Sequence, residues 1–523
     1  MKPGPRIGIV GSGFAGLCAA IRLQQAGFDD VTIFERAADV GGTWRDNTYP
    51  GCACDIPSNL YSFSFEPNPE WTRMYPQQGE IHSYLLRVVE KYGLRGKIRF
   101  GKELAEARFV EAACAWELRF IDGSSERVDI FIGATGPLSK PALPKIEGLA
   151  AFEGVAFHSA QWRHDVGLAG KRVAVVGTGA SAIQFVPRIA PLVSQLHVFQ
   201  RTPPWILPHR DRAFGPRERR LYRALPFAQR LLRWAVYLRQ ELLIFGFTGG
   251  ERVQRRFRSF ALWMLQTQVG SPELRRRLTP DYAPGCKRLL ISNDWYPALQ
   301  RSNVEVLAEP VARLEARRVV GASGASREVD VVIFATGFAA TDFVAPMKIY
   351  GRAGIELSAA WKNGAATHLG ISVAGFPNAF LVVGPNTGLG HNSLVFMIEA
   401  QVNYIVQCMK LVKQKGADYI DVKPEAMTRF LGEMTQALQG TVWSSGCKSW
   451  YQTADGINFA IWPKSTWRYW LETRRVNEAD YVFGKCTGST GKALGTGAGK
   501  AQGTGVGAGA LAGEQAIARM AQR

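Results

Sequence analysis

The 523-residue sequence lacks the features that mark membrane-spanning, secreted and zinc-binding proteins. It contains no long uncharged apolar stretch, so no transmembrane helix is predicted. The N-terminus runs directly into a predicted strand at Arg6–Val10, without the layout of a cleaved signal peptide, and we expect a cytoplasmic protein. The eight cysteines are scattered and include no C-x-x-C pair. This argues against a disulfide framework, a zinc ribbon and a thioredoxin-type redox pair, and we expect no metal site.

Acidic residues are scarce relative to basic ones, which gives a formal net charge of +19. Residues 201–280 hold 17 Arg and no Lys against five acidic residues, so twelve of these charges fall there. Such an excess can serve nucleic acid, an anionic membrane surface or phosphate-rich cofactors. A nucleic-acid-binding protein should also show basic residues interleaved with stacking aromatics in a recognisable module. We find none in the sequence, and we expect no nucleic-acid partner.

A strand, a glycine-rich turn, an amphipathic helix and a second strand follow one another at residues 6–37. The same order recurs at residues 172–201, so one βαβ unit is duplicated within the chain. Alternating strands and helices of this kind form parallel sheets with helices on their faces. The sequence therefore predicts an α/β fold with two Rossmann-like dinucleotide-binding domains.

The first glycine-rich turn, Gly11-Ser-Gly13-Phe-Ala-Gly16, has the pattern G-x-G-x-x-G. The first glycine allows a tight turn, the second lets a pyrophosphate approach, and the third permits close packing of the helix. The helix N-terminus offers unpaired N–H groups and a positive dipole end to the phosphates. Glu35 ends the next strand, where a carboxylate can accept hydrogen bonds from a ribose diol. We predict FAD here, with Gly42, Thr43 and Trp44 in a second turn that approaches it closely.

The glycine-rich turn of the second βαβ unit, Gly177-Thr-Gly179-Ala-Ser181-Ala182, has alanine in the third glycine position, which the fingerprint allows. Where the first unit reads VTIFER, the second reads LHVFQR, so Gln200 and Arg201 follow its strand. Loss of the carboxylate removes repulsion against a 2′-phosphate, and a guanidinium can bind that phosphate through two donors. The second site should therefore prefer NADPH to NADH.

These fingerprints predict the division of the chain into domains. Two later strands, 129–132 and 329–334, each run into Ala-Thr-Gly, where glycine lets the backbone pass close to a ligand. We expect residues 1–145 and 331–483 to form the FAD-binding domain and residues 146–330 the NADPH-binding domain. Residues 484–523 are rich in Gly, Ala and Thr without periodicity, and we expect a disordered tail there.

Residues 205–280 break the α/β rhythm and predict a helical insertion in the NADPH-binding domain. Its apolar residues recur at helical spacing, with many arginines between them: Leu221, Leu225, Ala228, Leu232 and Ala235. Three interpretations stay open: a solvated helix face, a cover or partner contact, and a peripheral membrane contact through 215–265. Arginines on the polar face of an amphipathic helix commonly remain solvated, which favours the first. Trp234, Tyr237, Leu242 and Phe245 accompany the arginines, which supports the third.

Between the two fingerprints lies Phe152-Glu-Gly154-Val-Ala-Phe-His158-Ser-Ala-Gln-Trp162. This segment resembles the F-x-G-x-x-x-H-x-x-x-W signature of Baeyer–Villiger monooxygenases, although Arg163 stands where that signature commonly continues with Pro or Asp. The related N- and S-oxygenating flavin monooxygenases usually end the pattern in Tyr. The resemblance extends over roughly residues 6–460.

The resemblance implies roles for further residues. The segment Tyr49–Asp55 is similar to one with an active-site Asp at position 55, and Cys286–Leu289 to one with a catalytic Arg at position 288. Lys287, Arg201 and Thr202 match NADP ligands of the family. Trp450 matches a residue that lines the substrate and nicotinamide pocket, to which the signature residues His158 and Trp162 are added. Apart from the resemblance, the glycine-rich turn 384–393, with Asn386, precedes a predicted helix whose N-terminus would face the flavin and stabilise its reduced ring. A simple turn with an N-cap is the alternative.

As the resemblance implies, the enzyme would convert ketones to esters or lactones with O₂, through a flavin C4a-peroxide formed after NADPH reduces FAD. Arg288 would stabilise the peroxyanion because its charge is permanent, and Asp55 would hold that guanidinium in place. An N- or S-oxygenating flavin monooxygenase of the same fold is the alternative. A disulfide reductase would need a paired redox cysteine, which the sequence lacks.

Overall fold

Two five-stranded parallel sheets form the framework of the protein, in a computed structural model that describes residues 4–339, 347–362, 364–447, 449, 451–453 and 456–486. The first sheet has the order β19-β7-β1-β2-β3 and the second β13-β10-β9-β17-β8. The first comprises β19 (Ala379–Leu381), β7 (Ile130–Gly133), β1 (Ile7–Val10), β2 (Val31–Phe34) and β3 (Ile98–Arg99). The second comprises β13 (Val304–Leu307), β10 (Gln195–Phe199), β9 (Arg172–Val176), β17 (Val331–Phe334) and β8 (Val155–His158).

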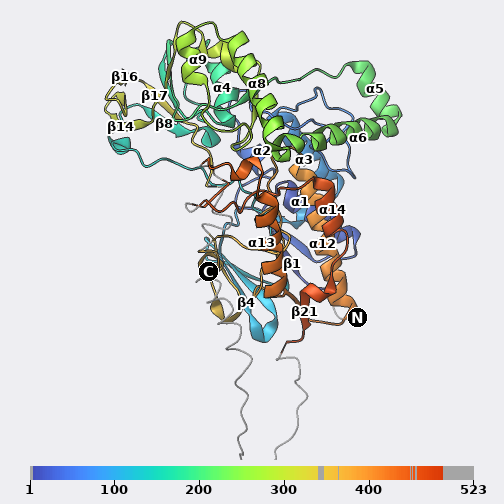
Figure 1. The fold of residues 1–523 in the computed structure, drawn as a ribbon. Helices are drawn as coiled ribbons and strands as arrows, with labels where there is room; N and C mark the ends of the chain where they lie inside the picture. The colour runs from blue at the N-terminus through green and yellow to red at the C-terminus, as the bar shows by residue number, and fades with distance from the viewer. Residues whose placement is uncertain are drawn as a thin grey trace, which may run out of the picture.

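The duplication predicted from sequence is present in the strand order. Strand β1 lies between β2 and β7, and β9 lies in the same way between β10 and β17. All of these pairings are parallel, which confirms the α/β class. In Figure 1 the first sheet lies in the lower part of the molecule and the second in the upper part.

The duplication extends further than the sequence showed. Each half carries an antiparallel three-stranded meander before the strand that leads into Ala-Thr-Gly. The first consists of β4 (Leu104–Val110), β5 (Ala115–Phe120) and β6 (Ser125–Val128), joined by β18 (Lys348–Tyr350). The second consists of β14 (Val311–Glu315), β15 (Arg318–Gly321) and β16 (Ser326–Glu328). The pairs β11 (Ile206–Leu207) with β12 (Leu290–Ile291), and β20 (Tyr419–Val422) with β21 (Tyr481–Gly484), complete the strands of the described residues.

Helices cover the sheets and bury their apolar faces. Helix α1 (Phe14–Gln25) packs against α12 (Leu394–Gln414), and α12 packs in turn against α14 (Thr466–Thr473). The buried side of α12 is almost continuously apolar, which fits a helix enclosed between two others. The remaining helices outside the insertion are α2 (Thr43–Asp46), α3 (Gln78–Lys91), α4 (Ala180–Ile189), α10 (Trp295–Leu299), α11 (Leu357–Ala360) and α13 (Pro424–Leu438).

The predicted insertion is helical, and the strands before and after it lie side by side. Its helices stand between β11 and β12, which pair with each other. They are α5 (Pro216–Ala224), α6 (Pro226–Leu242), α7 (Phe245–Thr248), α8 (Gly250–Gln268) and α9 (Pro272–Leu278). The apolar residues noted in the sequence do not belong to one helix, because α5 ends at Ala224 and α6 begins at Pro226, with Leu225 between them. Proline disfavours a helical conformation in the residue before it, and this ends α5.

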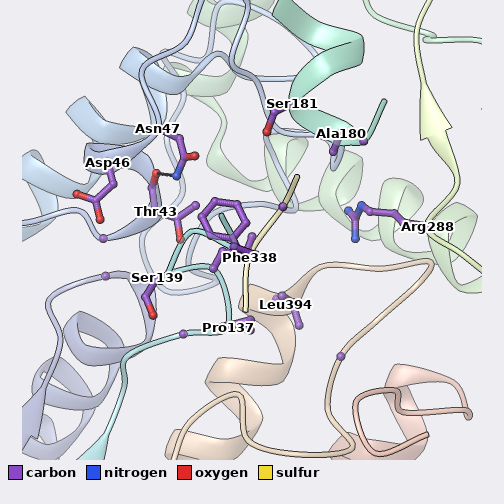
Figure 2. Close-up of a pocket in the computed structure, with 18 of the residues that line it drawn as sticks. Thr43, Asp46, Asn47, Pro137, Ser139, Ala180, Ser181, Arg288, Phe338 and Leu394 are labelled. Atoms are coloured by element: carbon purple, nitrogen blue, oxygen red, sulfur yellow. Dashed lines mark hydrogen bonds between the residues drawn. The ribbon is translucent and has the colours of Figure 1, made fainter. Parts of the chain in front are cut away.

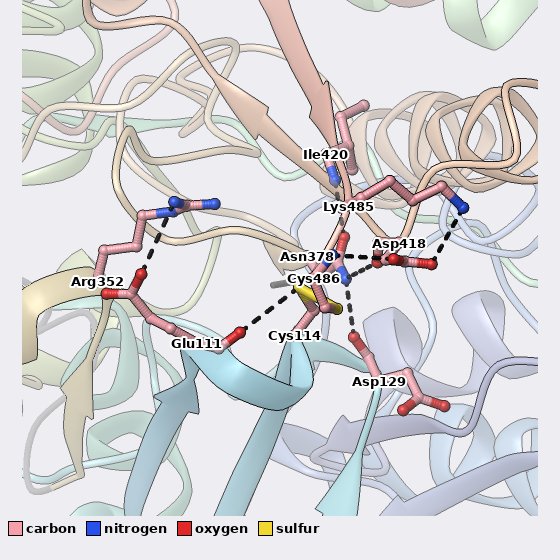
Figure 3. Close-up of a disulfide and its surroundings, with 9 residues drawn as sticks. All are labelled: Glu111, Cys114, Asp129, Arg352, Asn378, Asp418, Ile420, Lys485 and Cys486. Carbon is pink, nitrogen blue, oxygen red and sulfur yellow. Dashed lines mark hydrogen bonds and ion pairs between the residues drawn. A yellow bond between two sulfur atoms is a disulfide. The ribbon is translucent and has the colours of Figure 1, made fainter. Parts of the chain in front are cut away.

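Two disulfides correct the expectation that the scattered cysteines argue against disulfides. Cys114 pairs with Cys486 across 372 residues, and Cys286 pairs with Cys447 across 161 residues. Figure 3 shows the first, which joins the β4–β5 turn to the segment after β21, beside the ion pair of Lys485 with Asp418. Sequence spacing carried no signal for either pair, because only folding brings these residues together.

Three other expectations concern the ends and surface of the chain. In the predicted tail, 484–486 belong to the ordered structure, and residues 487–523 lie outside the described residues. No helix of the described part is long and apolar enough to cross a membrane. The predicted boundaries at 145/146 and 330/331 stay predictions.

Candidate functional site

A cavity of about 1060 Å³ lies between the two parallel sheets. Residues of both glycine fingerprints line it, and so do the two Ala-Thr-Gly turns. Pockets for one small molecule usually measure roughly 300–1,000 Å³, so this cavity lies at the top of that range. Figure 2 shows Thr43 and Asn47 on one side of the cavity, Arg288 on the other, and Leu394 at the start of α12.

The glycines of the first fingerprint differ in what requires them. A Cβ on Gly16 would lie 1.9 Å from the backbone oxygen of Gly11, so the chain itself excludes a side chain there. A Cβ on Gly13 would meet only the Cα of Gly42, at 3.8 Å, and the φ of Gly13 is an ordinary −79°. The fold therefore has room for a side chain at Gly13, and the N-terminus of α1 opens onto that space. This open cradle fits a pyrophosphate.

The second fingerprint repeats this arrangement. Gly177 has a φ of +104°, and a Cβ there would lie 2.6 Å from the backbone oxygen of Ala335. A Cβ on Gly179 would meet only that same oxygen at 3.9 Å. Ser181 lines the cavity beside the start of α4. Both cradles therefore fit a dinucleotide phosphate, one in each half of the molecule.

Glu35 and the turn after it form the far wall of the first cradle. The Glu35 carboxylate is buried, accepts hydrogen bonds from Ser12 N (2.9 Å) and Ser12 Oγ (2.6 Å), and forms an ion pair with Arg45 at 3.0 Å. Gly42, Thr43 and Trp44 line the same wall, and the Trp44 indole donates to the Tyr61 hydroxyl at 3.2 Å. The carboxylate is thus fixed at the edge of the cavity, where a ribose would lie.

The second cradle has cations at its edge instead. Gln200 is buried and turns away, donating to the backbone oxygen of Arg277 at 2.9 Å. Arg201, Thr202 and Lys287 line the cavity. Burial, together with the charge of Arg201, lowers the pKa of Lys287. Arg201 thus lies close enough to disfavour the charged form of Lys287, and an anion bound beside Lys287 would favour that form again.

Asp55 and Arg288 meet in the cavity wall. The Arg288 guanidinium donates to Asp55 Oδ2 from Nη2 at 2.6 Å and from Nε at 3.1 Å. The negative charge of Asp55 raises the pKa of Arg288 still further, so the cation is permanent. Both side chains remain partly exposed to the cavity. The sequence placed these residues 233 positions apart, and the fold brings them together as the resemblance implied.

The segment that carries Lys287 and Arg288 is tied covalently to another wall of the site. The disulfide from Cys286 reaches Cys447, in the segment that leads to Tyr451, which is buried and lines the cavity. Cys286 also packs in an apolar cluster with Trp443 and Phe247. These contacts fix the backbone next to Arg288.

Not every predicted site residue faces the cavity. His158 is buried, accepts from Ala160 N at 3.1 Å, and has its pKa lowered by burial. Trp162 packs against Phe157 and Phe185, and neither signature residue is part of the cavity lining. The Asn386 side chain is buried, with no hydrogen-bond partner among the described residues, and it too is outside the lining. Trp450 lies outside the described residues.

Sequence reasoning missed Gln184 on α4, which joins the two halves of the site. Its Oε1 accepts from the Tyr49 hydroxyl at 2.9 Å and Ala53 N at 3.3 Å, and its Nε2 donates to Ala53 O at 3.0 Å. The segment that carries Asp55 is thereby attached to the second fingerprint helix. A glutamine within the otherwise apolar helix segment 182–186 was the available signal.

Glu241 of α6 was missed in the same way. Its buried carboxylate accepts from the amide of Thr466 at 3.1 Å and from the side chains of Thr466 and Asn392. Asn392 lines the cavity, so this contact connects the insertion to the wall formed by the turn before α12.

Comparisons with known proteins agree with this geometry. Residues 9–77 match the model of the NAD(P)-binding Rossmann-like domain. A Baeyer–Villiger monooxygenase of Pseudomonas aeruginosa is 46% identical over 478 residues, which cover 91% of each chain. An oxidized steroid monooxygenase bound to NADP matches with a TM-score of 0.83 at 30% identity, over 92% of this chain and all of the other. A structure of OTEMO in complex with FAD and NADP matches with a TM-score of 0.83 at 26% identity, with the same coverage.

Proposed function

Because the chain belongs to the Baeyer–Villiger monooxygenase family, we propose that Arg288, held by Asp55, is the residue that stabilises negative charge on oxygen during ketone oxidation. The protein is an FAD- and NADPH-dependent monooxygenase that converts ketones to esters or lactones with O₂. The observation that carries the proposal is the placement of this ion pair in the wall of one cavity that both fingerprints line.

We assign FAD to the first cradle and NADPH to the second. FAD would be held by the following residues of the first half: Gly11, Gly13, Gly16, Glu35, Gly42, Thr43, Trp44 and Asp55. Asn386, whose buried side-chain amide has no partner among the described residues and lies outside the cavity lining, would support the FAD site from behind these residues. NADPH would be held by Gly177, Gly179, Ser181, Arg201, Thr202 and Lys287. The room left at Gly13 and Gly179 supports this assignment, since a Cβ at either position would fill space that no protein atom uses. Arg201 and Lys287 would bind the 2′-phosphate that distinguishes NADPH.

When bound, reduced FAD supplies the activation of O₂. The protein's part is electrostatic and positional. A guanidinium keeps its charge at every working pH, and a cation already in place needs no reorganisation when negative charge develops on a ketone oxygen. Asp55 uses two hydrogen bonds to one carboxylate oxygen to fix the direction of Arg288. The N-terminus of α12 at Leu394 adds a positive dipole end to the cavity wall.

Replacement of Arg288 tests this assignment. Arg288→Ala should keep FAD bound and should abolish ester formation from ketones. Arg163→Ala is the control, because Arg163 also forms an ion pair with an aspartate, Asp165, but on the surface and outside the cavity lining. Flavin absorbance and gas chromatography of ketone incubations measure the two properties. Ketone oxidation at the control rate in Arg288→Ala would remove Arg288 from the role, and an enzyme that oxygenates only amines or sulfides would favour the N- or S-oxygenating alternative.

The roles of the other residues predicted for the substrate pocket are also proposals. His158 and Trp162, which lie outside the cavity lining, would act by packing, and Trp450 would line the pocket itself.

We also propose that segment 215–265 contacts a membrane surface peripherally, which would bring a lipophilic ketone to the enzyme. Exposed apolar side chains on α6 support that contact.

A further inference from the structure

Helix α6 presents an apolar stripe to solvent. Five large side chains, which recur every three or four residues, are between 58% and 73% exposed: Phe227, Leu231, Trp234, Leu238 and Leu242. Since each helical residue turns by about 100°, this spacing puts all five on one line along the helix. A single exposed leucine is ordinary on a protein surface, whereas a continuous stripe of five marks an interaction site.

The opposite face of α6 fixes this orientation. The Gln229 amide donates to Asn59 Oδ1 and to Asn68 O, each at 2.7 Å. The Arg233 guanidinium donates to backbone oxygens of the same segment, including Asn59 O at 2.7 Å. These partners are specific and buried, so α6 cannot rotate its apolar stripe inward without leaving them unpaired. The stripe is therefore an outer surface of the folded protein.

The stripe also lies at the margin of the molecule. Figure 1 shows α5 and α6 at the side of the molecule, with α5 projecting beyond the rest of the upper part. The apolar surface continues past both ends of α6, since Leu225 before it and Phe245 after it are exposed as well. The apolar surface therefore extends beyond the length of α6.

The charge beside the stripe selects the kind of partner. Residues 215–265 contain 11 Arg and no Lys against three Glu and no Asp. Glu218 is already paired with Arg212, and Glu241 is buried. Arg230 and Arg239 are exposed and stand on opposite sides of the stripe, each turned by roughly 80–100° from its centre. Within the described residues, no ion pair involves Arg220, Arg230 or Arg256.

A second copy of the chain would bring the same cationic surface against this one, and like charges disfavour that pairing. Phosphodiester headgroups supply the opposite charge in the geometry that guanidinium binds best, directly beside an apolar layer. Helices with Trp, Phe and Leu on one side and Arg along the edges typically lie in the plane of a bilayer interface.

We propose that α6 docks on an anionic phospholipid bilayer, with its five apolar side chains at the acyl-chain boundary and the flanking arginines on lipid phosphates. This specifies the membrane contact proposed for 215–265 and does not depend on the ketone chemistry. The docked helix would hold the enzyme at the phase in which lipophilic ketones concentrate.

Co-sedimentation of the FAD-loaded enzyme with vesicles tests the docking. Wild type should bind vesicles of equal phosphatidylglycerol and phosphatidylcholine at low salt, and pure phosphatidylcholine at least tenfold more weakly. The triple variant Leu231→Gln/Trp234→Gln/Leu238→Gln should lose at least tenfold in apparent partition. Ile121→Gln/Leu192→Gln/Val482→Gln removes exposed apolar residues elsewhere and should bind as wild type does. Arg230→Gln/Arg239→Gln should weaken binding to anionic vesicles and reduce its salt dependence.

Three results would overturn the proposal: no wild-type binding at low salt, a stripe variant that binds as wild type does, and equal loss in the control. A wild type that elutes as a dimer and a stripe variant that elutes as a monomer would show that a second copy covers the stripe. All variants should keep their flavin absorbance and their ketone oxidation in vesicle-free solution, so failure of the docking is distinguishable from failure of the oxygenation.

Discussion

Removal of the two cations at the second cradle should change the coenzyme preference and leave the rest of the site intact. Arg201 and Lys287 line the cavity where Gln200 has turned away. A charged hydrogen bond is worth about 1.5–3 kcal/mol, and each 1.4 kcal/mol is tenfold in affinity. Arg201 is exposed, so solvent screening places Arg201→Gln at the lower end, about tenfold weaker NADPH binding. Lys287 is half-buried, so Lys287→Ala should cost roughly ten- to a hundredfold.

The pH dependence of NADPH binding follows from the lowered pKa of Lys287. Burial and Arg201 both disfavour its ammonium form, so Lys287 loses its proton at a lower pH than an ordinary lysine. NADPH affinity should therefore be full below that pKa and should fall as the pH rises through it, while NADH affinity stays constant. Arg201→Gln removes one of the causes, so it should move the fall to higher pH, and Lys287→Arg should abolish it.

Anaerobic stopped-flow reduction of the bound flavin gives the dissociation constants of both coenzymes. Arg188→Ala, on the surface of α4 and paired with Asp294, is the matched control and should bind NADPH normally. If Lys287→Ala weakened NADH as much as NADPH, the lysine would not bind a 2′-phosphate. The same result for Arg201→Gln would contradict the comparison of Glu35 with Gln200 and Arg201.

Four further outcomes are expected. Gly13→Ala should fold, because its Cβ would meet only Gly42 Cα at 3.8 Å, but it should lose FAD absorbance, because the methyl group would occupy the space of the pyrophosphate. Gly16→Ala should give little soluble protein, because its Cβ would lie 1.9 Å from the backbone oxygen of Gly11. Asp55→Asn should keep FAD and should lower the rate of ketone oxidation by about 10–100-fold, measured by product formation, because it removes a charged hydrogen-bonding partner. Glu241→Ala should destabilise the protein by about 2–4 kcal/mol in urea unfolding, because the buried donors of Thr466 and Asn392 lose their acceptor. Cys447→Ser should cost roughly 2–4 kcal/mol, and reductant should then have a smaller effect on this variant than on wild type.

The parts of the fold that sequence reasoning found are those with local signals. The two fingerprints combine a strand, a turn and a helix within about 30 residues, as in any βαβ unit. The same comparison distinguished the two sites, because Glu35 and Gln200 each directly follow their own strand and Arg201 comes next in the second unit. Pairing in parallel sheets then follows from the order of the elements.

The parts that sequence reasoning missed depend on residues far apart in the chain. The disulfide of Cys286 with Cys447 and the contacts of Gln184 with Tyr49 join segments more than 100 residues apart.

Other features were missed although they are local in sequence. The meanders β4–β6 and β14–β16 were overlooked because their short strands alternate weakly and lack a functional motif. Pro226 indicated that a helix would end near Leu225, but the helical spacing of the apolar residues continues past this position and hid the helix end.

The incorporation of isotopic oxygen tests the central claim most directly. Ketone, NADPH, a proton and O₂ should give an ester, NADP⁺ and water, so one atom of ¹⁸O₂ should enter the product and the other should enter water. The account predicts a ketone-derived ester or lactone with one ¹⁸O per NADPH consumed in coupled turnover, seen by mass spectrometry, and its loss in Arg288→Ala with FAD still bound. NADPH oxidation that leaves every ketone unchanged and labels only amines or sulfides would contradict it.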